Sequence, residues 1–187
     1  METTNLTGKL LVAMPGLGDP RFAHAVIFIC DHSAEGAMGL IVNKPADDID
    51  IPSLLSQLSI DMQAELSAHH AHFGGPVEMG RGFVLHSPDY ASAVATLEVS
   101  EEVHMTATMD ILEDLGRGEG PARWLLMLGY SGWGEGQLEA EIGENGWLIC
   151  PCSSDLLFVM AAGDKWDKAL ASIGVSPRML SAEGGRA

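Results

Sequence analysis

The chain has 187 residues, of which 47% are hydrophobic and 19% charged, so it can bury a core and is not an intrinsically disordered chain. Its length predicts a single domain over residues 1–187. The formal net charge is −16 and no two basic residues are adjacent, which argues against direct binding of DNA or RNA.

The start of the chain lacks the pattern of a signal peptide or a membrane anchor. Its first apolar run, residues 10–14, is ended by Pro15 and Gly16 and is too short for either. The three cysteines, an odd number, do not suit a disulfide scaffold. We therefore expect a cytoplasmic protein without membrane contact, with flexible tails at residues 1–6 and 181–187.

Several apolar runs have the length of β-strands and are bounded by Gly, Pro, Asn or Asp. They are residues 10–14, 25–30, 40–42, 83–85, 124–128 and 147–150. Continuous rather than alternating apolarity predicts that both faces of these strands are buried. Residues 94–99 and 103–108 are more mixed and flank the acidic pair Glu101 and Glu102, which predicts a hairpin nearer the surface.

Helical periodicity appears between these runs. Residues 51–58 carry apolar side chains at i, i+3, i+4 and i+7, and Asp50 precedes them as an N-cap. Shorter faces lie at 111–115, where Gly116 is predicted to end the helix, and at 166–173. Strands and short helices interleave without regular βαβ alternation, which predicts an α+β fold with a mixed, largely antiparallel sheet and a few short covering helices.

The segment GYSGWGEGQLE at 129–139 is the most distinctive in the chain. Its glycines surround Tyr130 and Trp133, which predicts a rigid, shaped loop between a strand and a short helix, with Gln137 hydrogen-bonded to that loop. Ser131 is not predicted as a nucleophile, because Trp133 stands where a nucleophile elbow needs glycine and no histidine follows the serine. We predict no catalytic residue.

Motifs in a fixed order give the chain a specific resemblance to a known family. They are GKLLVAMPGL at 8–17 followed by Asp19, Pro20 and Phe22, GAMGLIVNKP at 36–45, GGPV at 74–77, RGFVLH at 81–86 and the segment at 129–139. Over about residues 6–173 the chain resembles the YqgE/AlgH family of bacterial proteins. The resemblance implies an α+β fold whose curved, bifurcated sheet closes into a pseudo-barrel, a cytoplasmic location and, through the AlgH name, a link with transcriptional regulation. It implies no established enzymatic activity.

The patterns that would hold a metal or a cofactor are incomplete. His69, His70 and His72 lie close together, but no further ligand has recognisable spacing, and Cys150 with Cys152 supplies only two thiols. A zinc site shared between the two groups would depend on the fold. The glycine-rich turn after the first strand lacks a dinucleotide fingerprint. We expect no metal and no cofactor.

A set of polar and aromatic residues forms the candidate site for a ligand or a partner, because a few polar groups at strand ends are the usual composition of a small pocket. The set is Asn43, Lys44, Arg81, His86, Tyr130 and Trp133. The alternative is that Lys44 and Arg81 are solvated or ion-paired and that His86 is a strand-end histidine with satisfied hydrogen bonds.

Two functions from different classes follow from these residues. The first is a non-catalytic regulatory or protein-binding factor, linked to transcriptional regulation without direct DNA binding, for which the aromatic loop would anchor an unidentified protein partner. The second is a small-molecule-binding protein or enzyme with a pocket near the strand ends and the loop of Tyr130 and Trp133. Direct nucleic-acid binding is the least favoured because of the acidic charge.

Overall fold

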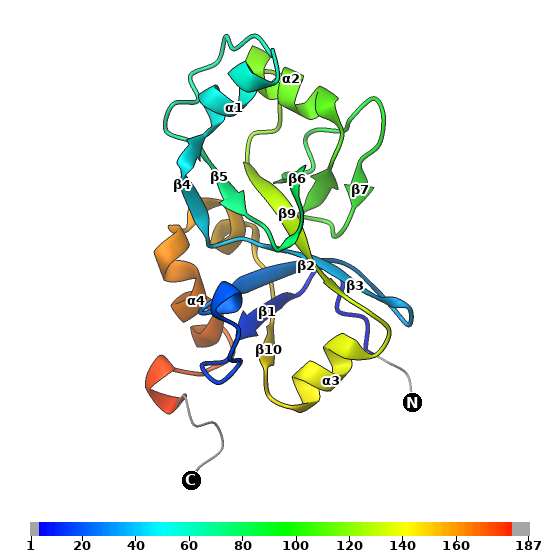
Figure 1. Cartoon of the computed structure of the whole chain (residues 1–187), viewed down its shortest axis with the longest axis vertical. Helices are drawn as coiled ribbons and strands as arrows, with labels where there is room; N and C mark the ends of the chain where they lie inside the picture. The colour runs from blue at the N-terminus through cyan, green and yellow to red at the C-terminus, as the bar shows by residue number, and fades with distance from the viewer. Residues whose placement is uncertain (1–3, 181–187) are drawn as a thin grey trace.

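The computed structural model describes residues 4–180, and its centre is a ten-stranded sheet (Figure 1). The strands are β1 (Leu10–Ala13), β2 (Val26–Ser33), β3 (Gly36–Ile41), β4 (Pro45–Asp50), β5 (His70–Phe73), β6 (Val77–His86), β7 (Leu97–Glu98), β8 (His104–Thr106), β9 (Trp124–Trp133) and β10 (Trp147–Cys150). The helices are α1 (Ile51–Gln57), α2 (Met109–Arg117), α3 (Gln137–Gly143) and α4 (Ala162–Ala171). Shorter helical turns are Pro20–Phe22, Asp155–Val159 and Pro177–Met179, the second of them a π-helical turn.

Strand β9 joins two halves of the sheet. Neighbouring strands follow the order β10-β1-β2-β3-β9-β6-β8-β7, while β4 pairs with β5 and β5 joins β9 in parallel. The last residues of β9, from Ser131 to Trp133, pair with β3, whereas Trp124 to Tyr130 pair with β6. The sheet therefore divides at β9 and curls into a half-barrel, which confirms the predicted α+β fold with a curved, largely antiparallel sheet.

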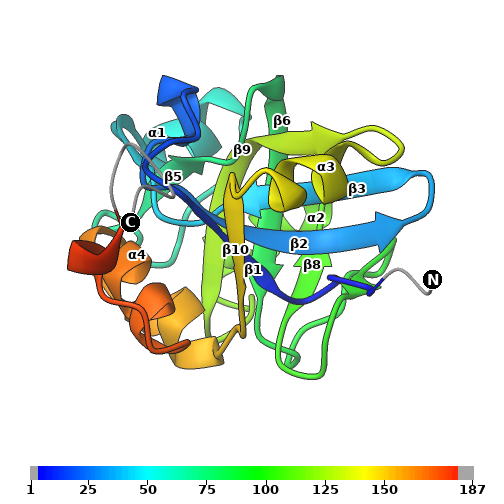
Figure 2. The same ribbon diagram turned by 90° about the horizontal axis from the view of Figure 1, so that it is seen from below.

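Strand β1 and the first five residues of β2 are buried on both faces, as their continuous apolarity predicted, whereas Ile149 of β10 is exposed. Leu10 and Phe28 belong to a core that α4 covers, while Leu11 and Ile27 belong to a second core that contains Leu138 of α3 (Figure 2). A third core lies between α1, α2 and the strands β6 and β9. The two covering helices of the first half thus lie on opposite faces of one layer of strands.

The prediction of a loop around Tyr130 and Trp133 is wrong, because residues 129–133 are the end of β9. Gly129 permits the close approach of another segment, because a Cβ atom on it would lie 2.4 Å from the carbonyl oxygen of Gly75. The connection to α3 is residues 134–136, where Gln137 Oε1 accepts a hydrogen bond from the Gly134 N–H at 3.0 Å. The predicted structural role of the Gln137 amide is confirmed.

The sequence predicted the start of α1 correctly, but it placed the terminating glycine of α2 two residues too early. Asp50 Oδ1 accepts a hydrogen bond from the Ser53 N–H at 2.8 Å, so the predicted N-cap is confirmed. Helix α2 ends at Gly118, whose φ of 78° is left-handed, and not at Gly116. A Cβ atom on Gly116 would lie 2.6 Å from the carbonyl oxygen of Asp61, so this glycine allows packing instead. The predicted hairpin is formed by β7 and β8.

Packing against the core begins nearer the N-terminus than predicted. Leu6 is buried, and its N–H donates to Nδ1 of His32 at 3.0 Å, so the prediction of a flexible tail over residues 1–6 is wrong at this residue. Residues 1–3 and the predicted C-terminal tail, 181–187, lie outside the described residues. Within residues 4–180, no helix is both long enough and apolar enough to cross a membrane.

Candidate functional site

Helices α1 and α2 lie at one end of the molecule (Figure 1). An apolar groove is lined by residues of both helices. Its volume is about 270 Å³, and β6 and β9 contribute to its lining. The lining residues are Leu54, Leu58, Gly80, Arg81, Gly82, Val84, Thr106, Ala107, Thr108, Met109, Ile111, Leu112, Leu126 and Leu128. Apolar concave surfaces of this kind are the usual sites for ligands and for partner segments.

The amphipathic helices supply both the core beneath the groove and its rim. Ile51 and Leu55 of α1 are buried in the third core, while Leu58, at the end of the same helix, is 40% exposed. Met109 begins α2 and is 50% exposed, although Ile111 two residues later is buried. Each helix therefore presents one large apolar side chain to solvent at the edge of the groove.

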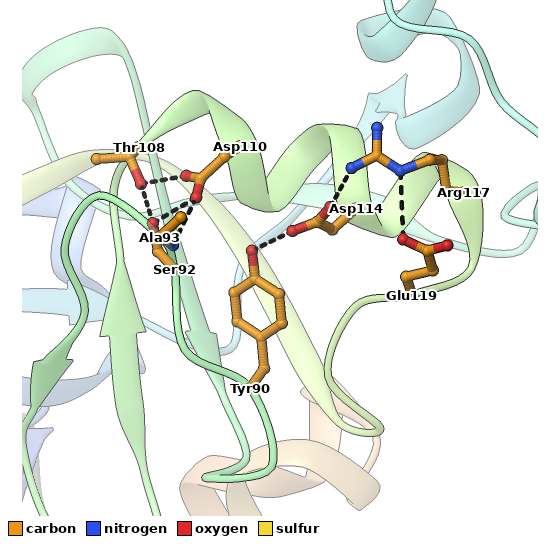
Figure 3. Close-up of polar contacts among 8 residues, drawn as sticks. All are labelled: Tyr90, Ser92, Ala93, Thr108, Asp110, Asp114, Arg117 and Glu119. Carbon is orange, nitrogen blue, oxygen red and sulfur yellow. Dashed lines mark hydrogen bonds and ion pairs between the residues drawn. The ribbon is translucent and has the colours of Figure 1, made fainter.

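A network of polar side chains fixes α2 against the segment that follows β6 (Figure 3). Asp110 accepts hydrogen bonds from the hydroxyls of Ser92 and Thr108 and from the N–H of Ala93. Burial opposes ionisation of Asp110, but these hydrogen bonds outweigh it and lower the pKa of the carboxyl group. A carboxylate in the first turn also lies at the favourable end of the helix dipole.

The same network continues one turn further along α2 (Figure 3). The hydroxyl of Tyr90 donates to Asp114 Oδ2 at 2.6 Å, and Asp114 also pairs with Arg117. Burial and the Asp114 carboxylate raise the pKa of Tyr90, so the phenol stays protonated and keeps donating. Helix α2 is consequently a rigid wall of the groove rather than a loose cover.

Replacement of Asp110 by alanine should lower the free energy of unfolding by about 1–3 kcal/mol, because it removes three hydrogen bonds and the N-terminal carboxylate of α2. Urea denaturation followed by circular dichroism measures the loss. Glu113→Ala is the matched control, since Glu113 is an exposed carboxylate on the same helix. Equal stability losses in the two variants would contradict this role for Asp110.

Acidic side chains line a hollow that adjoins the groove, whereas the charged residue that lines the groove itself is Arg81. A second hollow of about 320 Å³ shares Leu58 and Met109 with the groove and is lined by Asp61, Glu113 and Arg117 among others. The guanidinium of Arg117 is paired with Asp114 and Glu119. Arg81, at the other end of the groove, lies 3.6 Å from a carboxylate oxygen of Glu78. Both arginines near the groove are therefore paired with carboxylates, whereas Asp61 and Glu113 form no ion pair among residues 4–180.

The structure brings Arg81 and Tyr130 of the candidate set to one aromatic ring. The Arg81 guanidinium carbon lies 5.0 Å from the centroid of the Phe83 ring, and the Tyr130 ring lies 5.8 Å from it edge-on. Arg81 also lines the groove, whereas Tyr130 packs against the first core. The two residues are thus close to each other without lining the same hollow.

His86 and Trp133 are buried. His86 is fully buried, with Nε2 within 2.8 Å of the Thr106 hydroxyl and Nδ1 within 2.8 Å of the Ser87 carbonyl oxygen. This is the strand-end histidine with satisfied hydrogen bonds that the sequence left as an alternative, and burial lowers its pKa. Trp133 packs edge-on against Trp147, with 6.1 Å between ring centroids, in the second core.

Asn43 and Lys44 lie together at another hollow, of about 300 Å³, which is lined also by His24 and Trp166. None of the hollows described here is lined by all six candidate residues. The predicted set is therefore distributed over the groove, the hollow at Lys44 and the buried cores. That these residues bind a ligand or partner stays a prediction.

The histidines and cysteines do not assemble into a metal-binding group within the described residues. His69 stacks on Trp124 with ring centroids 4.7 Å apart, and burial, followed by the charge of Lys165, lowers the pKa of His72 to about 4. Cys150 and Cys152 are free thiols. Burial raises the pKa of Cys150 to about 11 and that of Cys152 to about 12, so both stay protonated and weakly nucleophilic.

Sequence reasoning missed Lys165, which is 2% exposed inside the first core. Its Nζ donates to the carbonyl oxygens of Val42 at 2.9 Å and Leu157 at 2.8 Å. The sequence signal that could have identified Lys165 as buried is its position four residues before Ala169, on the apolar face of α4. Leu58 and Met109 were missed as groove residues because apolar periodicity marks a helix face without saying what covers it.

Comparison with known proteins identifies close relatives over the full length of the chain. The chain is 57% identical over 184 residues to a UPF0301 protein of Ruegeria pomeroyi, covering 98% of this chain and 100% of the relative. It is 54% identical over 186 residues to a UPF0301 protein of a Jannaschia species, covering 99% and 97%.

Solved structures agree with this assignment. The solution structure of the AlgH protein from Pseudomonas aeruginosa matches with a TM-score of 0.80 and 37% identity, over 100% of this chain and 98% of that one. A crystal structure of a protein from Corynebacterium diphtheriae matches with a TM-score of 0.71 at 19% identity, over 91% and 88%, and so supports the fold alone. The family model described as AlgH-like matches residues 10–178. The chain belongs to the AlgH-like family of UPF0301 proteins.

Proposed function

We propose that the protein is a non-catalytic regulatory factor that binds a segment of a partner protein in the groove between α1 and α2. The observation that supports this most is the pair of exposed apolar side chains, Leu58 and Met109, which both line the apolar groove. An amphipathic helix or extended segment places apolar anchors into grooves of this kind. Methionine at the rim adapts its shape to different anchors.

The charge around the groove selects the kind of partner. Asp61 and Glu113 line the adjoining hollow, and the protein has a net charge of −16, so a basic segment is attracted and an acidic one repelled. We therefore propose a segment with two or three apolar anchors flanked by Lys or Arg. Such a partner is consistent with a cytoplasmic role in transcriptional regulation exerted through proteins, since the acidic surface disfavours direct DNA binding.

Selection from a displayed library of peptides of about 15 residues, against the purified protein, tests the proposal. We expect enriched peptides that combine apolar anchors with basic flanks. Fluorescence polarisation should then show binding at least about tenfold weaker, or about 1.4 kcal/mol, for Met109→Glu, because a carboxylate would enter the apolar hollow. Affinity should also fall as salt is raised.

The matched control is Met179→Glu, since Met179 is 72% exposed and does not line the groove. This variant should bind the selected peptides as the wild-type protein does. Enrichment of acidic peptides, or equal weakening by the two variants, would overturn the assignment of the groove as the binding site.

A further inference from the structure

The bend after the first strand is held by side chains from the turn that follows β3. Asn43 Oδ1 accepts from the Val26 N–H at 2.9 Å, and its Nδ2 donates to the His24 carbonyl oxygen at 2.8 Å. Lys44 Nζ donates to the Ala23 carbonyl oxygen at 2.7 Å. Two consecutive residues thus fix three residues of a segment about twenty positions earlier, and with them the position of His24.

His24 stands between two hollows. On one side, a hollow of about 300 Å³ is lined by His24, Asn43, Lys44, Ala162, Gly163, Trp166 and Asp167. On the other side, a hollow of about 270 Å³ is lined by residues from Met14 to His24. The His24 ring lies edge-on against Trp166, with 4.4 Å between ring centroids, so the imidazole forms a wall of defined orientation.

The polar groups of the first hollow have unused donor capacity. A lysine ammonium has three N–H donors, and Lys44 uses one of them, on the Ala23 carbonyl oxygen. In the described part of the chain, Lys44 makes no ion pair with a carboxylate. The His24 ring makes no hydrogen bond within the same residues. Exposed His24 and half-exposed Lys44 therefore line one hollow, with donors that a ligand entering from solvent can reach.

We infer that this hollow binds the oxyanion group of a small molecule, a carboxylate or a phosphate, between the Lys44 ammonium and the His24 imidazole. A charge-assisted hydrogen bond from the Lys44 ammonium and a hydrogen bond from an N–H of the His24 ring would hold the anion. Trp166 would border the remainder of the ligand, because its ring lines the same hollow. Asp167 also lines it and would disfavour a ligand of high negative charge.

Gly163 allows a sharp test, because an added Cβ atom there would have no heavy atom within 4 Å and the fold should not change. Gly163→Asp places a carboxylate at the mouth of the hollow and leaves Lys44 and its contacts in place. The matched control is Gly163→Ala, which changes the same position without adding a charge. Inorganic phosphate and acetate serve as separate probes, titrated into each protein and followed by two-dimensional amide NMR.

The wild-type protein and Gly163→Ala should bind at least one of the two anions, with shifts at His24, Lys44 and Gly163, and Gly163→Asp should bind it at least about tenfold more weakly. Preference for phosphate or for acetate identifies which oxyanion the ligand carries. Lys44→Gln should lose the same binding while Lys168→Gln, an exposed lysine of α4 outside the hollow, retains it. Binding of neither anion, or equal binding by Gly163→Asp, would overturn the inference.

Discussion

Replacement of Gly129 by alanine is expected to lower the free energy of unfolding by about 4 kcal/mol or more, a large fraction of the stability of a typical domain. Gly129 has a φ of 76°, which alanine adopts with strain. Its Cβ atom would lie 2.4 Å from the carbonyl oxygen of Gly75 and 3.1 Å from that of Val77. Both obstacles are backbone atoms of the segment entering β6, so no side chain can move aside to accept the methyl group.

Gly132→Ala is the control within the same segment of β9. An added Cβ there would meet the Tyr130 ring at 3.4 Å, and no left-handed φ is required. This variant should fold and lose no more than about 1 kcal/mol. Soluble expression and urea denaturation of the two variants compare them directly. A folded Gly129→Ala protein of near wild-type stability would show that the segments can separate without cost.

The role of Gly129 explains why residues 129–133 were predicted to form a loop rather than the end of a strand. A glycine indicates a left-handed turn or a close approach of another backbone, and the sequence does not distinguish the two. Gly129, with a φ of 76°, meets both requirements within a strand, whereas Gly136, with a φ of 73°, lies in the connection to α3 and has no close neighbour at its Cβ position. The order of strands around β9, which brings residues 74–75 to Gly129, was not readable from local patterns.

Strands such as β1 and β2 were predictable because burial on both faces leaves continuous apolar runs, whereas the polar strands β4 and β5 were not predicted. The candidate site was predictable only in part. Asn43 and Lys44 do meet at one hollow, because they are adjacent in sequence. Arg81 and His86 lie on β6, which β9 separates from β3, so they cannot join that hollow. Which strand ends converge depends on sheet topology rather than on residue type.

The free energy of unfolding is expected to change with pH because of the buried Lys165. Burial lowers its pKa from 10.5 to about 8, partly offset by Cys152. A neutral amine has two N–H donors, which the carbonyl oxygens of Val42 and Leu157 accept. Protonation adds a third N–H with no further acceptor among the described residues. The folded state therefore favours the neutral amine.

The sign of the effect follows from proton binding. Below about pH 8 both states hold the proton, and the folded protein carries the full cost of a buried charge. Between about pH 8 and 10.5 the unfolded chain binds more protons than the folded protein, so stability rises with pH. The rise attributable to Lys165 should reach up to about 3 kcal/mol.

Comparison of the wild-type protein with Lys165→Met isolates this contribution. The buried thiols act in the opposite direction, since their raised pKa values favour the unfolded state at alkaline pH. They are common to both proteins, and placing both in a Cys152→Ala background removes the thiol that interacts with Lys165. Urea denaturation at intervals from pH 7 to pH 10.5 should then show the wild-type protein gaining stability relative to Lys165→Met. A constant difference across that range would mean that Lys165 remains protonated in the folded core.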